Sequence, residues 1–146
     1  MSQETESGFT LLELLVAITI IAILAGVVSP MIFRNVDDAK VSAARTQIEA
    51  FGLALDTYYL HCGGYPSTAE GLAVLVTRPD STACPGWRGP YLKKAVPSDP
   101  WGRPYLYLGP GAVNPASYDL SSLGKDGTPG GVDDAADLTS WGDTHP

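Results

Sequence analysis

The first part of the chain carries two hydrophobic patterns in succession, and together they predict one long helix. Residues from Leu14 to Phe33 carry no charge, and as a helix they rise about 30 Å, the thickness of the hydrocarbon core of a bilayer. Beyond Arg34 apolar residues recur mostly at three- and four-residue steps, at Val36, Ala39, Ala44, Ile48, Phe51, Leu55 and Tyr58. We therefore expect a membrane-spanning half followed by an amphipathic half that packs one face on a domain.

The uncharged run has two competing interpretations. A secretory signal peptide has a basic start and a shorter apolar region, whereas residues 1–7 contain Glu4 and Glu6 and no Lys or Arg. A buried core helix of this length and apolar character is unusual in a chain of 146 residues. A membrane span is therefore the favoured interpretation.

The remainder of the chain predicts a small mixed domain. The sequence Cys62-Gly63-Gly64, followed by Pro66, ends the helix, and Ser67 with Glu70 forms a capping box for a short helix carrying Leu72, Leu75 and Val76. Two short strands, at residues 105–108 and 118–120, flank a long turn over residues 109–117. The predicted fold class is α+β, with the long helix packed on a small antiparallel sheet.

Composition and motifs argue against two classes of function, nucleic-acid binding and catalysis. The net charge is -7, and all basic residues lie at or after Arg34 without forming a long run, which argues against nucleic acid as a partner. No Gly-x-Ser-x-Gly motif or phosphate-binding glycine loop is present, and only His61 and His145 are available as a histidine base. An enzyme is therefore not expected. A membrane-anchored hydrolase would need a histidine near Ser121 or Ser122.

An acidic segment near the C-terminus is a candidate metal site. From Asp126 to Asp143 there are aspartates and glycines but no Lys or Arg, so oxygen ligands lie on a backbone that turns sharply. Calcium takes six to eight oxygen ligands in flexible geometry, whereas magnesium demands a tighter octahedron. The spacing does not match an EF-hand. From composition alone, a calcium loop and a solvated acidic loop both remain open.

The two cysteines, Cys62 and Cys84, lie beside turns rich in glycine or proline. An exported setting permits a disulfide between them, and the alternative is two free thiols. Both states remain open from the sequence.

The start of the helix carries the most specific motif. Glu13 stands at the head of the apolar run, where a carboxylate needs a partner, neutralisation or a place among lipid headgroups. The sequence Gly-Phe-Thr-Leu-Leu-Glu, residues 8–13, resembles the processing signal of type IV pilins and type II secretion pseudopilins. The resemblance implies cleavage between Gly8 and Phe9, methylation of the new amino group of Phe9, and a role for Glu13 in assembly. A buried Glu13 would then meet the amine of Phe9 in a neighbouring subunit.

Two further stretches narrow the family. Asp99-Pro100-Trp101-Gly102, and the segment from Tyr118 to Gly127 that leads to Asp137, Leu138 and Trp141, are similar to the major pseudopilin, the general secretion pathway protein G family. This resemblance implies a lollipop-shaped, pilin-like subunit of the secretion pseudopilus, which polymerises and drives export of folded proteins across the outer membrane. A type IV pilin for adhesion or motility is the alternative.

The resemblance also implies an organisation and a set of partners. The expected parts are a leader at 1–8, a transmembrane half-helix at 9–33, an amphipathic half-helix at 34–62 and a globular domain at 63–146 with an acidic loop at 121–138. The expected location is the bacterial inner membrane, crossed once, with a cytoplasmic N-terminus and a periplasmic domain. The expected partners are copies of the chain itself, minor pseudopilins, the inner-membrane assembly platform and the prepilin peptidase, which is also the methyltransferase.

Major pseudopilins bind structural calcium in the acidic loop. Carried onto this chain, that property implies side-chain ligands from Asp126 and Asp137, with Asp133 or Asp134 between them. Leu123 and Lys125 are implied to offer backbone carbonyl oxygens. The ion would neutralise carboxylates that otherwise repel each other, and its binding energy would order a loop with little apolar content.

Overall fold

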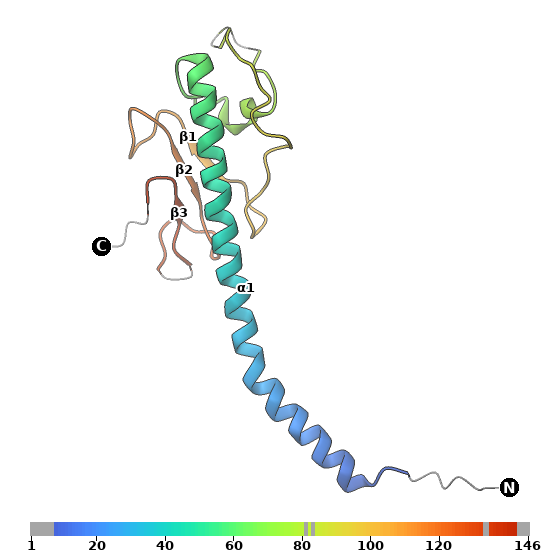
Figure 1. The fold of residues 1–146 in the computed structure, drawn as a ribbon. Coiled ribbons are helices and arrows are strands. Elements are labelled where there is room, and N and C mark those ends of the chain that lie inside the picture. The colour runs from blue at the N-terminus through green and yellow to red at the C-terminus, as the bar shows by residue number, and fades with distance from the viewer. Residues whose placement is uncertain (1–7, 81, 83, 133–134, 143–146) are drawn as a thin grey trace, which may run out of the picture. The chain divides into compact units, whose positions relative to one another are not determined.

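The computed structural model describes residues 8–80, 82, 84–132 and 135–142, and within the helix it describes residues 27–34 by their backbone alone. The elements in chain order are the helix α1 at Leu11–Cys62, the 3-10 helix η1 at Gly71–Leu75, and the strands β1 at Leu106–Leu108, β2 at Asp119–Ser122 and β3 at Leu138–Thr139 (Figure 1). Contacts divide the chain into two compact units, Met1–Asp37 and Asp38–Pro146.

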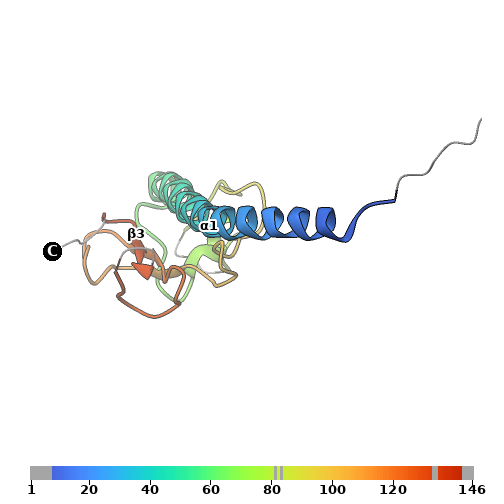
Figure 2. The ribbon, with the colours of Figure 1, turned by 90° about the horizontal axis from the view of Figure 1, so that it is seen from below.

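The second unit is built on the amphipathic half of α1. In Figure 2 the strands and η1 lie on the same side of this half of the helix. The predicted stripe is buried from Ala44 to Tyr58, and one of its fully buried members, Phe51, meets Tyr105 edge-on with ring centroids 5.1 Å apart. Arg45, Glu49 and Asp56 are exposed, as their positions off the stripe predict.

Two members of the predicted stripe are not buried. Val36 is 47% exposed, and Ala39 is exposed as well. Both residues precede Ala44, the first buried residue of the stripe. The apolar pattern therefore begins about two helical turns before the part of α1 that packs in the core. Conversely, Ala54 is buried although it was not part of the stripe.

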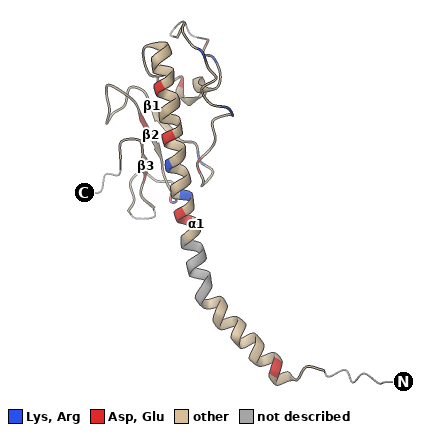
Figure 3. Ribbon diagram, viewed as in Figure 1, with Lys and Arg blue, Asp and Glu red and all other residues tan. Residues whose placement is uncertain are grey.

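The first unit contains the beginning of α1. Its described apolar side chains, from Leu11 to Leu24, are exposed, and Glu13 is the acidic residue of its first turn. Figure 3 shows acidic colour near the beginning of the helix. Within the described part of the chain, no helix combines the length and hydropathy of a membrane span. The predicted span over residues 9–33 includes positions 27–33, whose side chains lie outside the described residues.

The long helix ends where the glycines predict. Gly63 follows Cys62 with a φ of 76°, and its N–H donates to the carbonyl oxygen of Tyr59 at 2.7 Å. A left-handed residue in this position satisfies one of the free carbonyl groups at a helix C-terminus, and glycine adopts that conformation without a Cβ clash. The prediction of the helix end is confirmed.

The capping box is present, but it serves a turn and not an α-helix. Ser67 donates its N–H and its Oγ–H to Glu70 Oε2, at 2.9 and 2.8 Å, and Glu70 N–H donates to Ser67 Oγ at 3.3 Å. Gly71 then has a φ of 59°, and the five-residue 3-10 helix η1 follows. In this tighter helix Leu72, Val74 and Leu75 are buried, whereas Val76, which was predicted to lie on the helix, is its C-cap residue and is half-buried.

The sheet has three antiparallel strands in the order β1-β2-β3. Leu106 pairs with Ser121 and Leu108 with Asp119, which confirms the two predicted strands. The third strand, β3, pairs Leu138 with Ser122 and was not predicted. Leu120 of β2 is fully buried and belongs to the same hydrophobic cluster as Phe51 and Leu55 of α1.

The turn between β1 and β2 is organised by one buried carboxylate. Asp119 is 7% exposed and accepts hydrogen bonds from the N–H groups of Val113 and Asn114, at 2.8 and 3.1 Å, and from Asn114 Nδ2 at 3.1 Å. Desolvation raises the pKa of Asp119, but these hydrogen bonds favour the charged form and the net effect is a lowered pKa.

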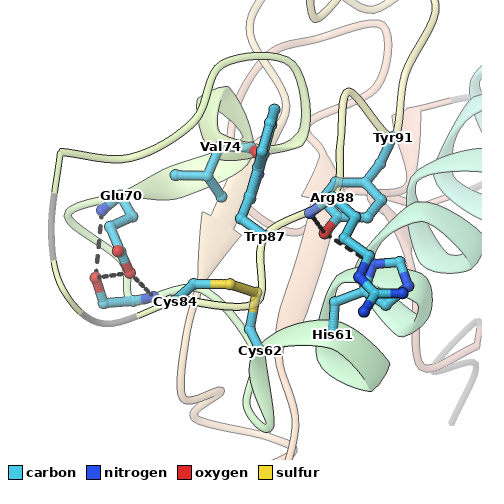
Figure 4. The surroundings of a disulfide bond; sticks show 9 residues. His61, Cys62, Glu70, Val74, Cys84, Trp87, Arg88 and Tyr91 are labelled. Carbon is cyan, nitrogen blue, oxygen red and sulfur yellow. Dashed lines mark hydrogen bonds between the residues drawn. A yellow bond between two sulfur atoms is a disulfide. The ribbon is translucent and has the colours of Figure 1, made fainter.

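A disulfide joins Cys62, the last residue of α1, to Cys84 in the segment after η1 (Figure 4). Trp87 Nε1–H donates to the carbonyl oxygen of Val74 at 2.9 Å, and the hydroxyl of Tyr91 lies 3.0 Å from His61 Nδ1. The covalent bond and these contacts fasten a segment without regular secondary structure to the end of the helix and to η1. Of the two states that the sequence leaves open, the structure has the disulfide.

Candidate functional site

The predicted processing site lies in chain that precedes the helix. Gly8 and Phe9 are exposed, Phe9 with 79% of its surface, and α1 begins only at Leu11. A peptidase requires an accessible, extended peptide bond, and the Gly8–Phe9 bond has no helical hydrogen bonds of its own to break. Residues 1–7 of the predicted leader lie outside the described residues.

Thr10 caps the start of α1. Its Oγ1 accepts a hydrogen bond from the N–H of Glu13 at 3.3 Å, and its carbonyl oxygen accepts one from the N–H of Leu14 at 3.2 Å. This role of Thr10 was not predicted from the sequence, although Thr10-Leu11-Leu12-Glu13 has the spacing of a capping box. Glu13 therefore lies in the first turn, exposed, where the partial positive charge of the helix N-terminus favours a carboxylate.

The first turn of the acidic loop is held by local hydrogen bonds. Asp126 Oδ1 accepts from Thr128 N–H at 3.1 Å, and Asp126 Oδ2 accepts from Thr128 Oγ1 at 2.9 Å. These two bonds lower the pKa of Asp126, and the nearby charge of Arg103 adds to the effect. The carbonyl oxygen of Leu123 accepts from Gly127 N–H at 3.1 Å, so the turn closes on itself.

The far end of the loop contains an unsatisfied acceptor. Asp137 Oδ2 accepts from Gly130 N–H at 2.9 Å, whereas Asp137 Oδ1 is buried with no hydrogen-bond partner among the described residues. A buried carboxylate oxygen without a partner is costly and is the kind of atom that a bound cation would satisfy.

The two ends of the loop approach each other closely. A Cβ on Gly124, which has a φ of 61°, would lie 2.8 Å from the carbonyl oxygen of Ala136. Only glycine accommodates both this conformation and this contact. The approach brings the carbonyl groups of 123–125 to the same region as the segment that carries Asp137.

The implied calcium ligands are thus only partly described. Asp126 and Asp137 lie at opposite ends of the loop, while Asp133 and Asp134 lie outside the described residues. Within the ranges that the structure describes, no three Asp, Glu, His or Cys side chains gather as a metal site. The chemistry of the donors fits a hard cation, because they are carboxylate and carbonyl oxygens and one of them is buried and unsatisfied.

The start of the loop is tied to the turn before β1. Arg103 Nη1–H donates to the carbonyl oxygen of Gly124 at 2.7 Å. The buried carboxylate of Asp99 accepts from Ser122 Oγ–H at 2.6 Å and from Arg103 N–H at 2.8 Å. These residues were not predicted to be part of the site, since Arg103 lies far from the loop along the chain and no local pattern links them.

The hydrolase arrangement can be compared directly with these contacts. Ser122 is fully buried, and its hydroxyl donates to Asp99. His61 has its Nδ1 beside the hydroxyl of Tyr91, and His145 lies outside the described residues. In the described part of the chain, Ser122 is thus a structural residue of the loop.

Comparisons with known proteins agree with both motifs. A family model described as "Type II secretion system (T2SS), protein G" matches residues 31–141, and one described as "Prokaryotic N-terminal methylation motif" matches residues 5–29. The "Type II secretion system core protein G" of Pseudomonas aeruginosa is 46% identical over 143 residues, which cover 97% of this chain and 99% of that protein. The protein of the same name from Escherichia coli K12 is 40% identical, with 95% and 93% covered.

A solved structure is also similar. The crystal structure of the major pseudopilin from the type 2 secretion system of enterohaemorrhagic Escherichia coli aligns with a TM-score of 0.62 and 32% sequence identity. The alignment covers 77% of this chain and 92% of that chain.

Proposed function

The chain belongs to the type II secretion system protein G family, the major pseudopilins, and from that premise we propose that it polymerises through the first half of α1 into the filament that drives export of folded proteins across the outer membrane. The observation that carries the proposal is the start of α1, where exposed apolar side chains surround one exposed carboxylate in the first turn. The surface of a partner that packs on this part of the helix must be apolar, with a positively charged group opposite Glu13.

Processing would provide the missing counter-charge. Cleavage after Gly8 makes Phe9 the N-terminal residue and gives it a positively charged amine, which methylation preserves. In a packed filament the amine of one subunit would neutralise Glu13 of its neighbour and offset the desolvation of both charges. The prepilin peptidase, minor pseudopilins and the inner-membrane assembly platform are the proposed partners.

We place the subunit in the inner membrane before assembly, crossing it once through residues 9–33 with the N-terminus in the cytoplasm and the domain in the periplasm. The uncharged sequence from Leu14 to Phe33 supports this location. Protease protection in spheroplasts tests it: an externally added protease should reach the domain, and protection of the domain would contradict the orientation.

The substitution Glu13→Val tests the assembly role. Mass spectrometry should still find a mature N-terminus at Phe9, and the protein should remain in the membrane fraction, but filaments and export should be lost. Glu49→Val, which removes an exposed carboxylate from the same helix, is the matched control and should assemble. Normal filaments from Glu13→Val would refute the role. Long surface fibres and adhesion, with export unaffected by deletion of the chain, would indicate a type IV pilin instead.

We further propose that the acidic loop binds one structural calcium ion. The proposed ligands are Asp126, Asp137, one of Asp133 and Asp134, and the carbonyl oxygens of Leu123 and Lys125. The support is the buried, unsatisfied Oδ1 of Asp137 together with a donor set made of oxygens. The ion would supply positive charge to these carboxylates, and the chain's part is to hold their oxygens at the close approach of Gly124 to Ala136.

A melting experiment on the full chain in detergent tests the calcium site. Calcium should raise the melting temperature relative to chelator, and magnesium should raise it less. Asp137→Asn should remove the difference, whereas Asp80→Asn, an exposed aspartate outside the loop, should keep it. Identical melting of the unsubstituted chain in calcium and in chelator would exclude the site.

A further inference from the structure

The side chain of Arg103 lies against the first turn of the acidic loop. Its Nη1–H donates to the carbonyl oxygen of Gly124 at 2.7 Å, and its Nη2–H donates to that of Lys125 at 3.4 Å. A Cβ on Gly127 would overlap the guanidinium group, so the turn wraps closely around this side chain. One fixed positive charge thus contacts three residues of the loop.

The backbone of Arg103 is fixed as well. Its N–H donates to Asp99 Oδ1 at 2.8 Å, and its carbonyl oxygen accepts from Asp99 N–H at 2.7 Å. Asp99 is only 4% exposed and also accepts from Ser122 Oγ–H at 2.6 Å, while Ser122 Oγ accepts from Gly124 N–H at 3.3 Å. Asp99, Ser122, Gly124 and Arg103 therefore form a closed ring of hydrogen bonds between the turn before β1 and the loop.

We propose that Arg103 is a positioning residue that acts as a tethered cation, ordering residues 123–127 of the acidic loop before a metal ion binds, so that the part around Asp137 depends more strongly on calcium. The second half of this statement rests on the proposed calcium site; the first half does not. A guanidinium binds carbonyl oxygens through directed N–H groups and stays charged at every physiological pH. Because it is covalently attached, no change in metal concentration removes it.

The far half of the loop has no equivalent device among the described residues. Asp137 Oδ1 is buried there without a partner, and the neighbouring Gly130 N–H satisfies only Oδ2. Arg103 thus binds the carbonyl oxygens of Gly124 and Lys125 at the start of the loop, whereas the buried oxygen of Asp137 at its end still requires a cation.

Hydrogen exchange of the full chain in detergent, measured with and without calcium, separates the two parts. In chelator, the unsubstituted chain should exchange faster than in calcium over residues 130–137, and the difference over residues 123–127 should be smaller. Arg103→Gln should accelerate exchange of Gly127 in chelator by about tenfold, the effect of losing a hydrogen bond to a charged group. Arg78→Gln, which removes an exposed arginine of the same domain, is the matched control and should change neither part.

Two further measurements distinguish positioning from a general effect on folding. Arg103→Lys keeps the charge and should restore much of the protection of Gly127. The N–H of Ser140, which donates to Leu120 in the core, should be unaffected by Arg103→Gln, because the backbone bonds to Asp99 remain.

The exchange rates test the role of Arg103 and the calcium site separately. Unchanged exchange of residues 123–127 in Arg103→Gln would refute the positioning role, as would equal acceleration of Ser140 and Gly127. Exchange of residues 130–137 that ignores calcium in the unsubstituted chain would refute the proposed calcium site and leave the role of Arg103 intact.

Discussion

Removal of the disulfide should destabilise the domain by an amount that the loop length predicts. The bond closes a sequence separation of 22 residues between Cys62 and Cys84. In the chain-entropy model, freeing a loop of this size costs roughly 3 kcal/mol, because the unfolded chain gains conformations that the cross-link forbids. The contacts of Trp87 with Val74 and of Tyr91 with His61 remain in the folded state without the disulfide. The decrease in stability therefore comes mainly from the larger conformational entropy of the unfolded chain.

Thermal unfolding of the full chain in detergent, followed by circular dichroism, measures the effect. For a domain of about 110 residues, roughly 3 kcal/mol corresponds to a fall in melting temperature of about 12 °C. The comparison is made twice, once by adding a reductant to the unsubstituted chain and once with the double variant Cys62→Ser, Cys84→Ala. The reductant should have no effect on the double variant, which serves as the control for reduction.

The outcome that refutes this reasoning is a fall of less than about 3 °C in both comparisons, with the disulfide verified by mass spectrometry. In that case the unfolded chain would gain little freedom on reduction. A large fall in the double variant combined with none on reduction would attribute the effect to the substituted side chains, since Cys84 is only 2% exposed.

Two further predictions concern buried ionisable groups. Burial, aided by the charges of Asp99 and Asp56, raises the pKa of Tyr105 and Tyr118 to about 12, so the unfolded chain, with pKa values of about 10, loses these protons first. The stability that they contribute is present below pH 10 and is lost as the pH rises to 12. Comparison with the variants Tyr105→Phe and Tyr118→Phe isolates the tyrosinate absorbance of these two residues from that of exposed tyrosines such as Tyr59, and an increase in it before circular dichroism reports unfolding would contradict this. Asp119→Ala removes the acceptor for two backbone N–H groups and should cost roughly 3 kcal/mol in urea unfolding, against about 1 kcal/mol for Asn114→Ala, and equal effects of the two variants would argue against the role of Asp119.

Local signals in the sequence predicted local structure well. The end of α1 at Cys62 was predictable because a left-handed glycine must follow it, and β1 and β2 were predictable because apolar and aromatic residues flank a turn rich in glycine and proline. The short helix predicted after the capping box is present as a 3-10 helix, and its first residue, Gly71, has a left-handed backbone conformation.

Features that depend on distant contacts were not predictable. The strand β3 has two residues, which are too few to show an alternating pattern in the sequence. It forms because Leu138 pairs with Ser122 of β2. Arg103 reaches Gly124 across 21 positions, and nothing in either neighbourhood indicates the other. The ligand roles of Asp126 and Asp137 were inferred from the family resemblance alone. The structure brings the two ends of the loop together through the close approach of Gly124 to Ala136, which no local pattern predicts.

The two-residue strand β3 gives the acidic loop a role in the cooperativity of the domain. Asp137 directly precedes Leu138, which is 4% exposed and completes the core. Opening the far half of the loop would release this strand and leave a two-stranded hairpin, which is marginal on its own in water. The loop and the sheet therefore unfold as one cooperative unit, and a substitution that opens the loop should lower the stability of the entire domain.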